Sequence, residues 1–271
     1  MRSFSYLYPF TNMTCQVLSL ELAPGKKAYF ASDFHFGIPD AAATRLREQR
    51  VCRWLDMIRK DAQYIFLLGD LFDSWMEYKR VVPRGTVRFL GKLAELRDQG
   101  IDIQVFTGNH DLWMHGYFEE ELGIPVHKSL LDLTLAGKKF CLGHGDGVWK
   151  GEKKYLLMKA VLHHPVSQFL YRQLHPDLGL RLADFFSRLG PKHKAGETPL
   201  RPLEEEYQIR FARETLQHTH YDYFIFGHRH IPLSLELQQG VHFLNLGDWI
   251  SHDTYAVFDG IGVKLEKMEI K

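Results

Sequence analysis

Short apolar runs that end abruptly in clusters of Asp, Asn and His recur along this chain. Each run is rich in β-branched and aromatic residues and has the length of a buried strand. The clusters that follow are Asp33-Phe34-His35, Gly69-Asp70, Gly108-Asn109-His110-Asp111, Gly143-His144-Gly145-Asp146 and Gly227-His228-Arg229-His230. A sixth run, VHFLNL, ends in Gly247, Asp248 and Trp249. The repeated pattern predicts strands whose polar residues gather beyond the carboxyl ends of a sheet.

Helical periodicity fills the gaps between the early runs. Apolar residues recur at helical spacing over Ala41–Arg59 and again over Gly85–Gln99. Strands that alternate with helices indicate an α/β sheet. The last third is rich in strands, at Val241–Leu246, Tyr255–Phe258 and Val263–Met268, which predicts a second, more antiparallel sheet packed on the first. We therefore expect an α/β sandwich of two mixed β-sheets flanked by helices.

One segment breaks this alternation. Residues 149–189 have a helical pattern, interrupted at Pro165 and Pro176, and the loop GPKHKAGETP follows them. Because the segment lies between two of the polar clusters, the chain must leave the sheet and return to it. We therefore predict a helical cap insertion at about 149–205 within a main domain of residues 26–271, preceded by an N-terminal extension of residues 1–25. Met13 is an alternative start.

The predicted cap combines apolar and basic side chains. It carries more leucine and phenylalanine than one solvated helix displays, together with basic residues such as Lys153, Arg172 and Arg181. This combination suits an amphiphilic, anionic substrate or a membrane surface. The alternative is a pair of helices that packs its own apolar stripe on the body.

Composition narrows the class of protein. The 271 residues include 34 basic and 33 acidic side chains, and this balance argues against broad nucleic-acid binding. Three scattered cysteines favour neither a disulfide framework nor a thiolate zinc site, and they indicate a reducing compartment. No apolar run approaches the ~20 residues of a membrane-spanning helix. We expect a cytoplasmic protein.

The polar clusters offer the ligands of a metal centre. Hard divalent cations at a phosphate-cleaving site need oxygen and imidazole ligands on a rigid frame. A lone Asp after a strand is usually a turn or cap residue, and most of the 15 histidines are surface or core residues. Five strand ends that all carry such side chains are poorly explained in that way. The candidate ligands are Asp33, His35, Asp70, Asn109, His144, His228 and His230. For His228 and His230, we expect an extended backbone to place both side chains on one side.

The ordered set DFH, GDLFD, GNHD, GHGD and GHRH resembles the calcineurin-like metallophosphoesterase superfamily, from residue 28 to about 250. The resemblance implies two divalent metal ions with Asp70 as the bridging ligand. One ion would be held by Asp33, His35, Asp70 and His230. The other would be held by Asp70, Asn109, His144 and His228. The resemblance favours Mn²⁺, with iron and zinc as alternatives.

The expected mechanism is attack on phosphorus by a hydroxide that bridges the two metal ions. His110 follows the ligand Asn109, so we expect it to reach the leaving oxygen and to donate a proton or neutralise charge. Asp111 either orients His110 or caps a turn. Asp73 is expected to hold a ligand histidine by a hydrogen bond, and Asp146 to do likewise or to bind substrate.

Three further features narrow the substrate: GDLFDSW, HGDGVWKGEKKY and the helical insertion, with LGDW near the end. Together they resemble the UDP-2,3-diacylglucosamine hydrolase family of lipid A biosynthesis. The resemblance implies cleavage of the pyrophosphate to UMP and 2,3-diacylglucosamine 1-phosphate, with the cap around the acyl chains. It implies substrate contacts from Asn109, His110, Glu152, Lys194 and His228. It also implies peripheral contact with the cytoplasmic face of the inner membrane.

One position departs from that family, whose best-known members carry arginine where this chain has His110. Histidine there is the pattern of the wider superfamily. A general phosphodiesterase or phosphatase with another nucleotide or phospholipid substrate is therefore the first alternative. A non-catalytic scaffold is the second, but such relatives usually lose a ligand or this histidine.

Overall fold

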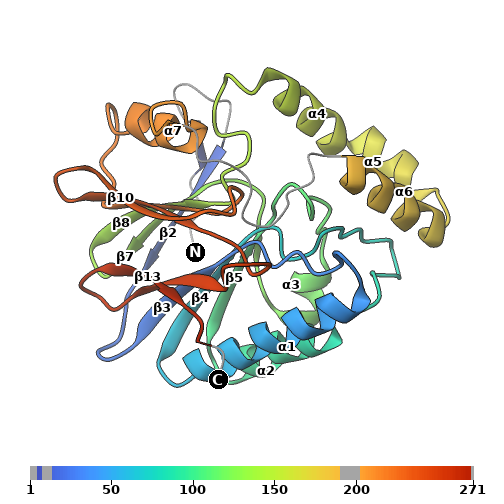
Figure 1. The fold of residues 1–271 in the computed structure, drawn as a ribbon, viewed down its shortest axis with the longest axis horizontal. Coiled ribbons are helices and arrows are strands. Elements are labelled where there is room, and N and C mark those ends of the chain that lie inside the picture. Colours follow the sequence, from blue (N-terminus) through green and yellow to red (C-terminus); the bar gives the residue numbers. More distant parts are fainter. Residues whose placement is uncertain (1–4, 8–13, 190–201, 270–271) are drawn as a thin grey trace.

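The computed structural model describes residues 5–7, 14–189 and 202–269. Two β-sheets stack face to face, with α1 and α2 on the outer face of one sheet and α7 on that of the other (Figure 1). The helices are α1 Ala41–Ile58, α2 Val87–Asp98, α3 Tyr117–Leu122, α4 Lys153–His163, α5 Pro165–Arg172, α6 Pro176–Leu189 and α7 Tyr207–Thr215. The predicted α/β sandwich of two mixed sheets is confirmed.

The six-stranded sheet has the order β13-β12-β3-β4-β5-β6, and its four strands from β3 to β6 run parallel. Its strands are β3 Lys27–Ala31, β4 Ala62–Leu68, β5 Asp102–Phe106, β6 Val126–His127, β12 Thr254–Phe258 and β13 Val263–Lys267. The seven-stranded sheet has the order β1-β2-β7-β8-β9-β11-β10. Its strands are β1 Ser5–Leu7, β2 Thr14–Leu20, β7 Leu131–Leu135, β8 Lys138–Gly143, β9 Tyr223–Phe226, β10 Pro232–Gln238 and β11 Val241–Leu246.

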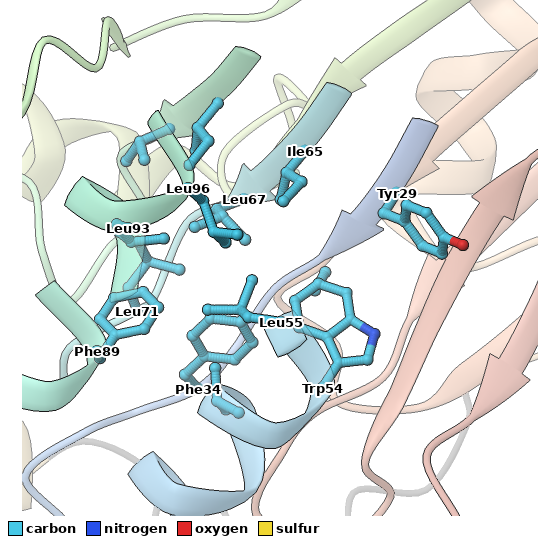
Figure 2. Packing of buried hydrophobic residues seen from close by; sticks show 14 of the residues in the cluster. Tyr29, Phe34, Trp54, Leu55, Ile65, Leu67, Leu71, Phe89, Leu93 and Leu96 are labelled. Carbon is cyan, nitrogen blue, oxygen red and sulfur yellow. The ribbon is translucent and has the colours of Figure 1, made fainter. Parts of the chain in front are cut away.

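Apolar packing fixes the relation of these layers. One buried cluster joins the six-stranded sheet to α1 and α2, a second fills the space between the sheets, and a third lies under α7. Figure 2 shows the first cluster, in which the Trp54 ring of α1 packs near Phe34, their centroids 6.5 Å apart. Leu93 of α2 lies in the same cluster and is fully buried. The many buried side chains of this cluster hold the edge of the sheet rigid, because closely packed protein interiors are hardly compressible.

Two expectations about strand assignment were wrong. The strands of the last third do not form a sheet of their own: β11 pairs with β9 in one sheet, while β12 pairs with β3 in the other. The predicted N-terminal extension, residues 1–25, contains β2, which is hydrogen-bonded in parallel to β7. Both errors arise because a strand's partner is set by contacts distant in sequence, which the pattern of one run does not record.

The predicted helical insertion forms three helices, α4, α5 and α6, which begin or break at the two prolines. They stand apart from the stacked layers, on one side of the molecule (Figure 1). Unlike α1, neither α4 nor α5 contains a buried side chain. Within the described residues, none of the helices combines the length and the apolar character that crossing a membrane requires.

Candidate metal centre

Both sheets contribute to the site, because β3, β4 and β5 belong to one and β8 and β9 to the other. The loops after these strands are linked by backbone hydrogen bonds. The amide of Asp33 donates to the carbonyl of Gly69 (3.0 Å), and that of His35 donates to the carbonyl of Asp70 (2.9 Å). The amide of Gly227 donates to the carbonyl of His144 (3.0 Å). The ligand loops are thus connected before any side chain is considered.

The first group of ligand atoms comes from Asp33, His35 and His230. The Nε2 atom of His230 lies 3.2 Å from Asp33 Oδ1 and 3.1 Å from His35 Nε2. One ligand atom from each of the three residues lies within 4.8 Å of the others. The three residues are at most 7% exposed.

The second group comes from Asp70, His144 and His228, with Asn109 beside it. The Nε2 atom of His144 lies 3.1 Å from Asp70 Oδ2 and 3.2 Å from Asn109 Oδ1. Asn109 Oδ1 is also 2.8 Å from His228 Nδ1. Asp70 Oδ2 is 3.5 Å from His35 Nε2, so this carboxylate faces both groups. The structure therefore brings all seven candidate ligands together, with Asp70 at the centre.

The chemistry of this donor set fits a pair of divalent cations. Asp33 and Asp70 are 0% and 1% exposed, and buried carboxylates need positive partners. The buried Arg47 does not meet that need, since it donates to the backbone carbonyls of Phe34 and His35. Imidazole nitrogens instead converge on the same points as the carboxylate oxygens. A mixed shell of this kind suits Mn²⁺, iron or Zn²⁺.

Glycines allow the loops to approach one another. A Cβ atom at Gly108 would overlap the Asp70 carboxylate, and one at Gly69 would lie 2.8 Å from His144 Nδ1 and from the backbone nitrogen of Gly108. A side chain at either position would therefore displace a ligand.

Five of the candidate ligands adopt left-handed backbone conformations. The φ angles are 57° at Asp33, 45° at His35, 51° at Asp70, 72° at His228 and 56° at His230. The expected extended backbone at His228 and His230 was therefore wrong. Such angles cost non-glycine residues of the order of 1–3 kcal/mol each and persist only where the surroundings hold them. Their concentration here marks the loops as functional.

Charges within the site favour ionised carboxylates. Burial alone would raise the pKa of Asp70, but the neighbouring imidazoles, His144 foremost, hold it well below its usual range. The pKa of Asp33 is lowered in the same way, chiefly by His230. His228 differs, because burial and the charge of His144 lower its pKa to about 3. Ionised carboxylates and a neutral imidazole are the forms that bind cations.

His110 lies beside the ligands and is oriented by Asp73. Its Nδ1 atom is 3.1 Å from the Asp73 carbonyl oxygen and 3.3 Å from Asp73 Oδ1. Burial alone would lower the pKa of His110, but the charges of Asp70 and Asp73 raise it to about 9. The carboxylate of Asp73 also lies 3.4 Å from Nδ1 of His35. It thus contacts both a candidate ligand and His110.

The expectation that Asp111 orients His110 was wrong. The Asp111 carboxylate accepts hydrogen bonds from the backbone amides of Gly108 (2.6 Å) and Leu71 (2.8 Å). It is therefore the turn-capping residue that was the alternative. Because side chains of adjacent residues diverge, proximity to His110 in sequence did not bring the two groups together.

Asp146 contacts the cap rather than a ligand ring. Its Oδ2 atom accepts hydrogen bonds from the Tyr155 hydroxyl and the Lys159 ammonium, each at 2.5 Å. Glu152, a predicted substrate contact, stands half-buried at the N-cap of α4. Lys194, the other predicted contact in the insertion, lies outside the described residues.

Sequence reasoning missed two groups that support the ligand loops. Asp248 Oδ2 lies 3.4 Å from His230 Nδ1 and is fully buried. The run VHFLNL before it carried the same signal as the ligand strands. The second group is an ion pair in which Arg229, between two candidate ligands, donates to Glu206 at 2.8 and 3.0 Å. Glu206 belongs to none of the polar clusters that follow the apolar runs, so only the folded chain reveals this contact.

Comparisons with known proteins agree with this geometry. A sequence profile of the family described as calcineurin-like phosphoesterase matches residues 26–232. A UDP-2,3-diacylglucosamine hydrolase from Porphyromonas gingivalis is 42% identical over 90% of this chain and 98% of its own length. An enzyme of the same name from Neisseria meningitidis is 28% identical over 89% of this chain and 99% of its own. The chain belongs to the calcineurin-like phosphoesterase family.

Proposed function

We propose that this chain hydrolyses the pyrophosphate bond of UDP-2,3-diacylglucosamine, releasing UMP and 2,3-diacylglucosamine 1-phosphate, a step of lipid A biosynthesis. The observation that carries the proposal is the 42% identity to a hydrolase of that name over 90% of this chain. A match of that extent includes the cap as well as the metal centre. It therefore covers the substrate-selecting part of the molecule, which a likeness of the ligand loops alone would not.

The seven ligands would hold two divalent cations, for which Mn²⁺ is our proposal. Asp33, His35, Asp70 and His230 surround one position, and Asp70, Asn109, His144 and His228 surround the other. When bound, such ions supply Lewis-acid activation of water and neutralise charge on phosphoryl oxygens. The protein's own part is to keep Asp33 and Asp70 ionised and the loops rigid.

His110 acts on the leaving side of the reaction. Its ring is held by Asp73 through Nδ1, which leaves Nε2 available to the substrate. The imidazolium form is favoured by Asp70 and Asp73, so His110 donates a hydrogen bond or a proton to the departing oxygen. A positive charge at this place offsets the negative charge that develops during phosphoryl transfer. Asn109, His228 and Glu152 complete the proposed contacts with substrate, together with Lys194.

The cap supplies the surface for the acyl chains. Leu157, Phe169, Leu170 and Phe185 are each more than half exposed. A monomeric globular protein rarely leaves so many large apolar side chains uncovered on adjacent helices. Acyl chains are the apolar groups that the proposed substrate would bring. The same surface suits a location at the cytoplasmic face of the inner membrane.

Comparing the release of UMP from diacylated and non-acylated UDP-glucosamine, with Mn²⁺ present, tests the substrate. We expect turnover of the diacylated compound to be faster by roughly a hundredfold, because remote binding energy raises the rate of the chemical step. Equal rates on the two compounds would contradict the lipid substrate. They would favour the second candidate, a general phosphodiesterase, to which the histidine at position 110 already points.

A further inference from the structure

The first helix of the cap, α4, is attached to the body by few contacts. It contains no buried residue, and Leu157, Met158 and Val161 are 50–69% exposed. Apolar burial, which positions α1 and α2, therefore contributes little to the position of α4. Polar contacts must fix where this helix stands.

One of these contacts is centred on Asp146. Tyr155 and Lys159 are four residues apart on α4 and so lie on one face of the helix. Both donate to the same oxygen of Asp146 at 2.5 Å. Asp146 is 5% exposed and Lys159 is 22% exposed at its side chain, so the ion pair is largely shielded from water. Removing Lys159 would leave a buried carboxylate that still accepts a hydrogen bond from the Tyr155 hydroxyl but has lost its ammonium partner, which is unfavourable.

Asp146 is two residues beyond the candidate ligand His144. The ring of His144 is fixed at both nitrogens: Nδ1 lies 2.9 Å from the carbonyl of Leu68, and Nε2 faces Asp70. Between them, the carbonyl of Gly145 accepts from the Gln208 amide (3.2 Å). The loop that holds Asp146 is therefore as firmly placed as the metal centre itself.

A second contact joins the other end of α4 to the loop that follows His110. The indole nitrogen of Trp113 donates to the carbonyl of Leu162 (3.1 Å). The Trp113 ring also packs edge-on against Tyr171 of α5, with centroids 4.6 Å apart. Both ends of α4 thus attach to loops that carry metal-site residues, within two residues of His144 at one end and three of His110 at the other.

We propose that Lys159 and Tyr155 are positioning residues: by holding α4 on Asp146 they fix the cap relative to the metal centre, and so align the pyrophosphate of a cap-bound substrate with it. This inference rests on the proposed function. In the proposed function the acyl chains bind to cap helices that bury little apolar surface against the body of the protein. The reacting phosphate is therefore aligned with the metal centre only when α4 is held in its place. A misplacement of about 1 Å between bound groups can lower a rate roughly a hundredfold.

The test compares Lys159→Met with Lys154→Met, an exposed lysine of the same helix. For Lys159→Met we expect kcat on UDP-2,3-diacylglucosamine to fall roughly ten- to hundredfold with Mn²⁺ content unchanged. Turnover of bis(4-nitrophenyl) phosphate, which has no acyl chain to engage the cap, should stay within about twofold. Lys154→Met should match the wild type on both substrates, and Lys159→Arg should recover most of the lost rate.

Equal losses on both substrates in Lys159→Met would overturn the proposal, because Lys159 would then serve the metal centre alone. No loss on either substrate would overturn it too. In addition, Lys159→Met combined with Asp146→Asn should be no slower than the slower single variant if the two residues act as one unit.

Hydrogen exchange separates failure of this inference from failure of the proposed function. We expect amides of residues 153–163 to exchange roughly tenfold faster in Lys159→Met than in Lys154→Met. If the wild type does not cleave the UDP-lipid, the proposed function fails, while exchange still decides whether Lys159 holds α4. Identical exchange in the two variants would contradict the tether.

Discussion

In the metal centre Asp33 and Asp70 are at most 1% exposed, whereas in the cap Leu157 and Phe169 remain 69% and 62% exposed. The centre stands on strands from both sheets, with a buried apolar cluster beneath it. The cap is held at a few polar points. The comparison teaches that the chemistry resides in a rigid frame that tolerates little change. On the proposed function, the choice of substrate resides on the surface of the cap, whose exposed side chains contribute little to folding.

Of the changes that we propose, Asp70→Ala in the metal centre should have the largest effect on activity. This carboxylate faces both ligand groups, so its loss should remove both metal ions and abolish phosphoester cleavage. Elemental analysis and a phosphodiester assay measure the two effects. Asp98→Ala, at an exposed position on α2, is the control. Two ions per chain in the Asp70 variant would disprove the shared ligand.

His110→Ala should come next. It removes a group that acts on the leaving oxygen but holds no ion in our assignment. We expect kcat to fall by roughly 10²–10⁴ with the metal content retained. His220→Ala, 65% exposed at its side chain, should behave as the wild type. Loss of the ions from the His110 variant would instead assign His110 as a ligand, an arrangement that its closeness to His35 and Asp70 allows.

Folding stability should separate the two regions directly. Leu93→Ala in the cluster under the sheet should lower the free energy of unfolding by about 2–5 kcal/mol. Phe169→Ala in the cap should change it by less than about 0.5 kcal/mol, since this ring is largely in water already. Urea unfolding of both variants gives the two values. A comparable loss in the cap variant would mean that the cap packs as a second core.

A triple variant with Leu157→Ser, Phe169→Ser and Phe185→Ser should lower the rate on the diacylated substrate only. We expect kcat/KM for the diacylated UDP-sugar to fall roughly tenfold or more, because apolar area for the acyl chains is removed. Cleavage of bis(4-nitrophenyl) phosphate should not change. Assays of the two substrates side by side measure this. An equal loss on both substrates would contradict the assignment of these three residues to acyl-chain binding.

The smallest expected effect is a pH dependence of the free energy of unfolding, caused by Asp132 of β7. Burial raises its pKa to about 6 from an ordinary 3.8, despite the hydrogen bond from the Tyr221 hydroxyl. A raised folded-state pKa means that the stability linked to the protonated carboxyl is present below about pH 4 and is lost as pH rises through 6. Asp132→Asn should therefore be more stable than the wild type at pH 7.5, by about 1 kcal/mol, and not at pH 4. Thermal unfolding at both pH values checks this.

Much of the two-sheet body and its metal centre could be predicted from the sequence, because each strand that carries a ligand ends where an apolar run changes to a polar cluster. The helices α1 and α2 follow from local patterns, and the meeting of Asp33, Asp70 and Asn109 follows from the edge shared by the parallel strands β3, β4 and β5. The assignment of β11 and β12 to different sheets could not be predicted, since it depends on pairing between distant segments.

Residues that support the ligands were harder to predict than the ligands themselves. Asp111 and Asp73 are both aspartates near the site, and only the folded backbone shows that Asp111 caps a turn while Asp73 contacts His110. The contact between Asp146 and Lys159 likewise depends on where α4 stands. Such groups have no sequence signature beyond their residue type, because their partners are fixed by tertiary structure.

Metal titration of chelator-treated protein tests the central claim most directly. With Mn²⁺ added stepwise and UMP release measured at each step, we expect two ions to bind per chain and activity to require both. Full cleavage of UDP-2,3-diacylglucosamine by protein shown to be free of metal would contradict the account.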